Sequence, residues 1–185
     1  MGEHHLLDDP RLTAVGLLVE VHTGLTARFA AQFCAHGISL VEFEVLTRLA
    51  RSPGHALRMS DLSAQTSLST SGVTRVVDRL ERDVLVARRA CASDRRSSYA
   101  VITPAGLAKL DDILPGHLEL IEQWFTGRLD AEQMTALLDA LRTIRDAVHP
   151  GATAGSAGPP GCSTTDGSTT AATGSSAAKQ AVAEV

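Results

Sequence analysis

The sequence predicts a mainly α-helical protein that carries one small β-hairpin. Along most of the chain, apolar side chains recur in steps of three and four, which is the spacing of one helix face. Aromatic residues make up only 3% of the sequence, so the core has to be built from Leu, Val, Ile and Ala, which suits packed helices. Two short segments near the middle, residues 84–90 and 98–102, have the composition of strands.

Two helices are expected before the middle of the chain. The first spans about residues 9–35 and is ended by His36-Gly37. Its core-facing side is formed at helical spacing by Leu18, His22, Leu25, Phe29 and Phe33. The second spans about residues 40–51 and is stopped by Ser52-Pro53-Gly54, after which residues 56–59 form a short extended link.

The middle of the chain has the layout of a helix-turn-helix followed by a hairpin. Ser60 is expected to cap a short helix over residues 61–66. After the turn Ser67-Leu68, either Ser69 or Thr70 caps a longer helix that reaches about Asp83. The two strands follow, joined by a polar tip over residues 91–97.

Two further helices and a compositionally distinct tail complete the prediction. Thr103-Pro104 opens a helix that continues to about residue 125, with a bend at Pro115-Gly116, and the last helix spans residues 130–148. In residues 150–185, Gly, Pro, Ser, Thr and Ala make up 29 of 36 positions. Such a segment cannot bury enough apolar area to offset its ordering entropy, so we expect the folded unit to end near His149.

Charge and cysteine usage restrict the class of function. The net charge is −4, yet residues 72–99 contain seven arginines against four acids, which favours contact with a polyanion. The three cysteines are isolated, which excludes a disulfide framework or a zinc ribbon. No signal sequence and no long apolar run is present, so we expect a cytoplasmic protein without a membrane partner.

The helix over residues 70–83 carries the most informative pattern. Val73, Val77, Leu80 and Val84 share one face and are expected to lie against the core. The opposite face has short hydroxyl side chains near its start and arginines further along. A helix that enters the major groove of DNA needs this arrangement. The alternative is a capped helix whose charged face is simply solvated. The hairpin tip Asp94-Arg95-Arg96 adds a second basic feature, suited to the narrow minor groove.

These segments resemble the MarR family of bacterial transcriptional regulators. The resemblance rests on V-T-R-V-V-D-R-L-E-R, which leads to L-V-A-R, and on a D-R-R tip followed by a strand that ends in T-P-A-G. It implies a winged helix-turn-helix and a dimer intertwined through the N- and C-terminal helices. It also implies a DNA-binding lobe over about residues 40–103 and dimerisation helices over about 9–35 and 104–148, within a domain spanning residues 9–149 after a flexible segment 1–8.

The expected function is sequence-specific binding of double-stranded DNA at a pseudo-palindromic operator by a homodimer. We expect a repressor that is relieved by a small-molecule effector. The alternative is a winged-helix module that binds protein partners and has no DNA function. No enzyme motif is found, and no cofactor is expected. The expected DNA-binding residues are Ser69, Thr70, Ser71, Thr74, Arg75, Arg79, Asp94, Arg95 and Arg96.

The effector site is the least defined part of the prediction. His22 is the one candidate ligand contact, and a buried, hydrogen-bonded histidine is the alternative. No metal site is expected. His36, Glu42, Glu44 and His117 match no metal-binding motif and are expected to be solvated.

Overall fold

The structure is a computed structural model, and it describes residues 5–66, 68–90 and 98–153. Its main helices are α1 (Pro10–Ala35), α2 (Leu40–Ala50), α3 (Met59–Thr66), α4 (Thr70–Arg82), α5 (Pro104–Trp124) and α6 (Ala131–Val148). Short 3-10 turns are η1 (His5–Asp8), η2 (Pro53–His55), η3 (Thr126–Arg128) and η4 (Pro150–Thr153). This order confirms the predicted mainly helical fold class.

The described strands form one small antiparallel sheet. β3 (Ser98–Ile102) lies in the middle, between β1 (Ala56–Arg58) and β2 (Val86–Ala90). Ala100 of β3 is opposite Leu57 on one side and Arg88 on the other. The hairpin was predicted, and residues 56–59 were predicted as a short extended link; the extended conformation is confirmed for residues 56–58, but their pairing with the hairpin was not predicted. Three of these residues pair with β3, and Met59 already belongs to α3.

The helix ends follow side-chain caps. Asp9 accepts a hydrogen bond from the amide of Arg11 at the start of α1. Ser69, not Thr70, caps α4 by accepting from the amide of Gly72. Ser60 is not a cap, because α3 already begins at Met59. The strand predicted from residue 84 begins only at Val86, because Val84 adopts a positive φ of 60° just after α4. The prediction that Val84 faces the core was wrong for the same reason, since the helix has ended and its side chain is exposed.

One apolar core lies between the sheet and the helices that surround it. α2, α3 and α4 contribute most of its side chains, while α1 contributes Phe33 and α5 contributes Leu110 and Ile113. The other large, fully buried side chains are Val45, Leu46, Leu49, Leu57, Leu62, Val73, Val77, Leu80 and Val86. Because α4 buries its valines and Leu80 here, its opposite face is held towards solvent.

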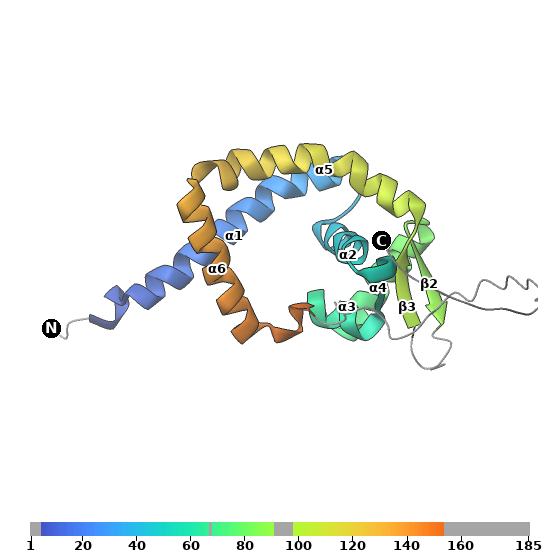
Figure 1. Cartoon of the computed structure of the whole chain (residues 1–185), viewed down its shortest axis with the longest axis horizontal. Helices are drawn as coiled ribbons and strands as arrows, with labels where there is room; N and C mark the ends of the chain where they lie inside the picture. Colours follow the sequence, from blue (N-terminus) through green and yellow to red (C-terminus); the bar gives the residue numbers. More distant parts are fainter. Residues whose placement is uncertain (1–4, 67, 91–97, 154–185) are drawn as a thin grey trace, which may run out of the picture.

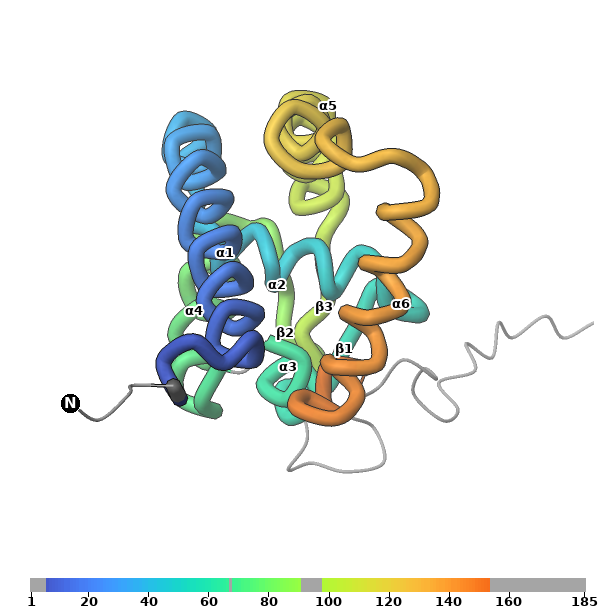
Figure 2. Tube along the Cα trace, turned by 90° about the vertical axis from the view of Figure 1, so that its left-hand side faces the viewer, coloured from blue at the N-terminus to red at the C-terminus, as the bar shows by residue number. Residues whose placement is uncertain are grey.

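Helices α1, α5 and α6 extend beyond this core. α6 turns back from the end of α5 and reaches α3 through η4, so that the chain forms an open ring in Figure 1. Figure 2 shows α1 and α6 on opposite sides of the molecule. Both helices expose large apolar side chains. They are Leu12, Val15, Leu17, Leu18, Val19 and Val21 on α1, and Leu138, Ile144 and Val148 on α6.

The predicted core-facing side of α1 is therefore only partly right. Phe33 is buried, and Leu25 and Phe29 are half-buried. Leu18 and His22 are exposed, since nothing in the described part of the chain covers the N-terminal half of α1. The periodicity predicted the helix correctly. It did not show that the N-terminal half of this helix packs against nothing in the described part of the chain.

The folded chain continues past its predicted end near His149. Residues 150–153 form η4, and Ala152 is buried. The Arg48 side chain donates to the Ala152 carbonyl over 3.0 Å, and His149 Nε2 lies 2.7 Å from the Ala64 carbonyl oxygen. Composition alone did not reveal this turn, because its stability comes from contacts with α2 and α3. At the other end, residues 5–8 of the segment predicted to be flexible form η1.

Candidate nucleic-acid interface

Helix α4 presents a polar face that is largely exposed and is bordered by Arg88 of β2. Val73, Val76, Val77 and Leu80 are buried on its inner side. The exposed residues of its outer side are Thr70, Ser71, Thr74, Arg75, Asp78, Arg79, Glu81 and Arg82. The structure thus brings together, on one element, the helix residues that the sequence singled out.

The hydroxyl groups near the start of α4 are partly used inside the helix. Ser69 Oγ accepts from the Gly72 amide over 3.1 Å and lies 3.1 Å from Ser71 Oγ. Thr74 Oγ1 donates to the Thr70 carbonyl over 2.8 Å. Since a hydroxyl has a single proton, Thr74 presents an acceptor and a methyl group outward. These short side chains allow a close approach at this end of the helix.

The two arginines predicted on this helix differ in their availability. Arg75 is exposed and forms no ion pair within residues 5–66, 68–90 and 98–153. In Arg79, Nε donates to Glu42 Oε1 on α2 over 2.7 Å, although 45% of the side chain stays exposed. Among these residues the guanidinium of Arg75 has no ion-pair partner, whereas Arg79 also ties α4 to α2.

Glu42 is held as a carboxylate by this arrangement. Burial raises its pKa, but hydrogen bonds from Arg79 and from the amide and hydroxyl of Ser39 outweigh that effect, so the pKa is lowered overall. Both Ser39 donors lie 2.8 Å from Glu42 Oε2. Glu42 thus caps α2 and binds α4 at the same time, and the prediction that it is solvated was wrong.

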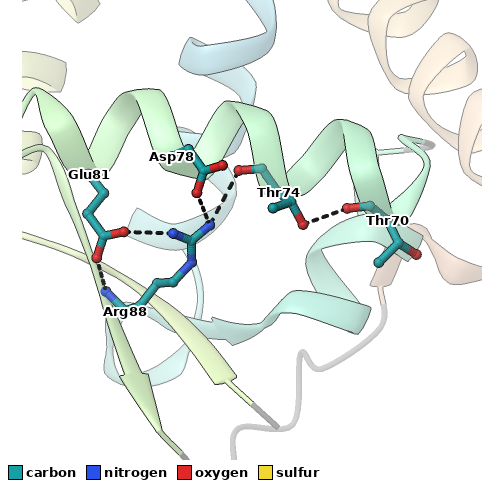
Figure 3. A network of polar contacts seen from close by, with 5 residues as sticks. All are labelled: Thr70, Thr74, Asp78, Glu81 and Arg88. Carbon is teal, nitrogen blue, oxygen red and sulfur yellow. Dashed lines mark hydrogen bonds and ion pairs between the residues drawn. The ribbon is translucent and has the colours of Figure 1, made fainter. Parts of the chain in front are cut away.

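Arg88 on β2 is joined to α4 by a network of contacts (Figure 3). Its Nη2 lies 2.6 Å from Asp78 Oδ1 and donates to the Thr74 carbonyl over 3.3 Å. Its Nη1 donates to Glu81 Oε2 over 2.7 Å, and its backbone amide donates to Glu81 Oε1 over 3.2 Å. Sequence reasoning counted Arg88 only as one charge of a basic segment. The spacing of Asp78 and Glu81 on one helix face was the available signal.

The predicted tip of the hairpin lies outside the described residues. Asp94, Arg95 and Arg96 belong to the segment 91–97, so the structure does not place them. The two strands that lead to this tip are described, and β2 lies beside the outer face of α4 through Arg88. Arg89, the next residue on β2, is exposed.

His22 lines a cleft of about 750 Å³ between α1, α2 and the end of the folded chain. Phe29 and Phe43 form apolar parts of its wall, and Arg48, Arg51 and Arg145 are its basic residues. Arg48 is paired with Glu44, which also lines the cleft, and Arg145 is paired with Asp146. The alternative of a buried His22 was wrong, because this side chain is exposed. The cleft as a whole was not predictable, because its walls come from segments more than a hundred residues apart.

His117 is a core residue. It lies 4.8–5.0 Å, ring centre to ring centre, from Phe29, Phe33 and Phe43. Its Nδ1 is 3.0 Å from Gln32 Oε1, and burial lowers its pKa, which favours the neutral ring. The prediction that it is solvated was wrong. No group of three or more potential metal ligands occurs in the described part of the chain.

Known proteins resemble this chain in sequence and in fold. The MarR family model matches residues 36–97, which include α2, α3, α4 and β2. The HTH-type transcriptional regulator MhqR of Bacillus subtilis is 31% identical over 109 residues, covering 59% of this chain and 73% of that protein.

Two solved structures from Streptomyces coelicolor extend the comparison to the fold. AbsC, a MarR family transcriptional regulator, has a TM-score of 0.71 and 32% identity, covering 77% of this chain and 96% of AbsC. Sco3205, a MarR family regulator solved in complex with DNA, has a TM-score of 0.70 and 29% identity, covering 75% of this chain and 88% of Sco3205.

Two further observations bear on the class of protein. The proteins that this chain resembles are transcriptional regulators and not enzymes. Among residues 5–66, 68–90 and 98–153, no single helix is long and apolar enough to cross a membrane; α1 and α2 reach that threshold only as a pair, bent by 84°. Together, the winged-helix fold, the α4 motif and these relatives show that the chain belongs to the MarR family of transcriptional regulators.

Proposed function

We propose that this protein is a homodimeric repressor that binds a pseudo-palindromic operator in double-stranded DNA and is released by a small molecule. The observation that carries the proposal is the outer face of α4, where small hydroxyl residues precede an exposed Arg75 that has no ion-pair partner in the described part of the chain. The helix dipole favours phosphate at the N-terminal end, and Arg reaches guanine edges from such a helix. The DNA complex of Sco3205 supports the same use of the fold.

The DNA contacts that we propose follow the sequence prediction with one change of emphasis. Ser69, Thr70, Ser71, Thr74 and Arg75 lie at the start of α4 and would enter the major groove. Arg79 keeps part of its side chain exposed and would reach the backbone from its Glu42 tether. The hairpin tip with Asp94, Arg95 and Arg96 would occupy the adjacent minor groove.

The homodimer is supported by the apolar surfaces of α1 and α6. The exposed leucines and valines on the first half of α1 and the exposed Leu138, Ile144 and Val148 on α6 lie outside the core of the single chain. Extended apolar surfaces of this kind are rarely left in water by a monomer. In a two-fold dimer the α4 helices would lie about 34 Å apart, one turn of DNA, which requires a pseudo-palindromic site.

The cleft beside His22 is the proposed effector site. Its aromatic wall suits a flat apolar body, and the three arginines suit an acidic group. Because α1, α6 and the α2 that supports α4 all border this cleft, a bound acid would bias the placement of the DNA-binding lobe. The rival function, a module that binds protein partners, is disfavoured because α4 exposes no aromatic or Met side chain.

The test is DNA selection followed by an Arg75→Ala variant. The unmodified protein should retain fragments from a genomic pool, with affinity that falls steeply as salt rises. Arg75→Ala should weaken binding to the selected fragment by about 1–3 kcal/mol, whereas Arg128→Ala on η3, which removes the same charge far from α4, should not.

Benzoate, but not benzamide, should weaken the complex with DNA by binding in the cleft beside His22. Absence of salt-sensitive DNA binding would favour the protein-partner module.

A further inference from the structure

We propose that Arg88 is a positioning residue that fixes the hairpin against the DNA-reading helix, and that it makes no DNA contact itself. The hairpin means β2 and β3, and the helix is α4. The inference rests on the proposed DNA binding and adds a role for a residue that is not among the expected DNA-binding residues.

The contacts of Arg88 span two turns of α4 on a single face. Its partners Thr74, Asp78 and Glu81 are separated by four and three residues, which places them one above the other along the helix. Glu81 also accepts the backbone amide of Arg88 over 3.2 Å. The network therefore holds the strand itself as well as its side chain.

These contacts leave Arg88 poorly suited to bind DNA. Nη1 is held by Glu81 and Nη2 by Asp78 and the Thr74 carbonyl, so neither is free for a bidentate contact with phosphate or guanine. Only 28% of its side chain is exposed. The two carboxylates nearby would repel a phosphate that approached the same guanidinium.

The placement of the hairpin relative to α4 should affect the affinity of the proposed DNA-binding surface. The helix and hairpin would occupy neighbouring grooves, so a change in their spacing breaks contacts in one groove or in the other. Holding that spacing before binding removes an ordering cost at the moment of binding. Arg89 offers an internal contrast, because it follows Arg88 on β2, is exposed, and forms no ion pair in the described part of the chain.

Removing the charges of Asp78 and Glu81 distinguishes the two possible roles of Arg88, because the two roles predict opposite changes in DNA affinity. The double variant Asp78→Asn with Glu81→Gln removes two negative charges from the DNA-facing side of the molecule. If Arg88 contacted phosphate, freeing it from these acids would tighten binding. If Arg88 acts by positioning, the same variant should weaken binding by about tenfold, as Arg88→Ala should, and the triple variant should be no worse than either.

The experiment uses the full chain and the fragment selected by the unmodified protein, at a temperature well below the melting point of every variant. Asp83→Asn, which removes an exposed acid just past α4, and Arg89→Ala, which removes the neighbouring cation, serve as controls. A residue with a purely structural role would lower the melting temperature and leave the dissociation constant of the folded protein unchanged.

Several results would overturn the proposal. They are tighter or unchanged binding by the Asp78→Asn, Glu81→Gln variant, additive losses in the triple variant, or wild-type affinity for Arg88→Ala. The two carboxylate substitutions are isosteric, so they test the idea even if Arg88→Ala does not fold. If the unmodified protein selects no fragment at all, the proposed DNA function fails instead, and the two failures are distinguishable.

Discussion

Val84 occupies a backbone conformation that normally belongs to glycine. Its φ is 60°, directly after the last turn of α4. The amide of Leu85 donates to the Leu80 carbonyl over 2.8 Å, and the amide of Val84 donates to the Glu81 carbonyl over 3.0 Å. This is the hydrogen-bond pattern of a Schellman motif with Val84 at its left-handed position. A β-branched residue is strained there.

Replacing Val84 with Gly should therefore stabilise the protein. The side chain is 65% exposed, so little apolar burial is lost. Relief of the left-handed strain, about 1–2 kcal/mol, should exceed the extra chain entropy of Gly, about 0.5–1 kcal/mol. Thermal or urea unfolding should show a net gain of about 0.5–1 kcal/mol. Val84→Ala, which keeps a Cβ at the strained position, should give less, and a less stable Val84→Gly would contradict the strain.

At the scale of elements, the Glu42–Arg79 pair links the cap of α2 to α4, the helix that we propose contacts DNA. Glu42 has a lowered pKa in the folded protein, so its stabilising effect is present above the pKa of the unfolded chain and is lost as pH falls through the folded value. His117 also lowers stability as pH falls. Burial lowers its pKa, so the ring takes up a proton more readily in the unfolded chain than in the folded one, and acid favours unfolding. Both effects make the folded protein sensitive to acid, and the effect of His117 is lost at a higher pH than that of Glu42.

Glu42→Gln should reduce the free energy of unfolding at neutral pH by about 1–3 kcal/mol, since it weakens charged hydrogen bonds to Arg79 and Ser39. The loss should shrink as pH falls below about 4.5, where Glu42 becomes neutral in the unfolded chain and then in the folded one. Urea titrations over a pH series measure this. Glu44→Gln, whose pair with Arg48 is 3.5 Å long and exposed, is the control and should cost little. A pH-independent difference would show that the carboxylate charge does not matter.

The elements also show what sequence patterns can and cannot predict. Helices such as α4 and α6 were predictable because their apolar periodicity and caps are local signals. β1 was missed because three residues are too few to show alternation, and its partner β3 lies more than forty residues away. The role of Arg88 was hidden for a similar reason, since its acids lie on another element. The residues on the outer face of α4 were predicted correctly because they all belong to one helix.

At the scale of the whole molecule, η4 joins the end of α6 to the DNA-binding lobe. Its contacts run from Arg48 on α2 to the Ala152 carbonyl and from His149 to the Ala64 carbonyl on α3. The same turn forms part of the wall of the cleft beside His22. η4 is thus part of the connection between α6 and helices α2 and α3.

Ending the chain at His149 should therefore lower stability, because it removes buried Ala152 and the acceptor of Arg48. We expect a loss of about 1–2 kcal/mol from one hydrogen bond and a small apolar contact. Differential scanning calorimetry of the two truncated proteins measures it. A chain that ends at Thr153 retains these contacts and is the matched control. Equal melting temperatures for the two truncations would show that η4 does not stabilise the lobe.

The central claim is that two copies of α4 read one duplex together. A hydroxyl-radical footprint of the protein on a fragment that it has selected tests this most directly, combined with a measured stoichiometry. We predict two chains per duplex and two protected regions related by a two-fold axis, about 10–10.5 base pairs apart, both weakened by Arg75→Ala. A single protected region bound by one chain, or protection unaffected by Arg75→Ala, would contradict the claim.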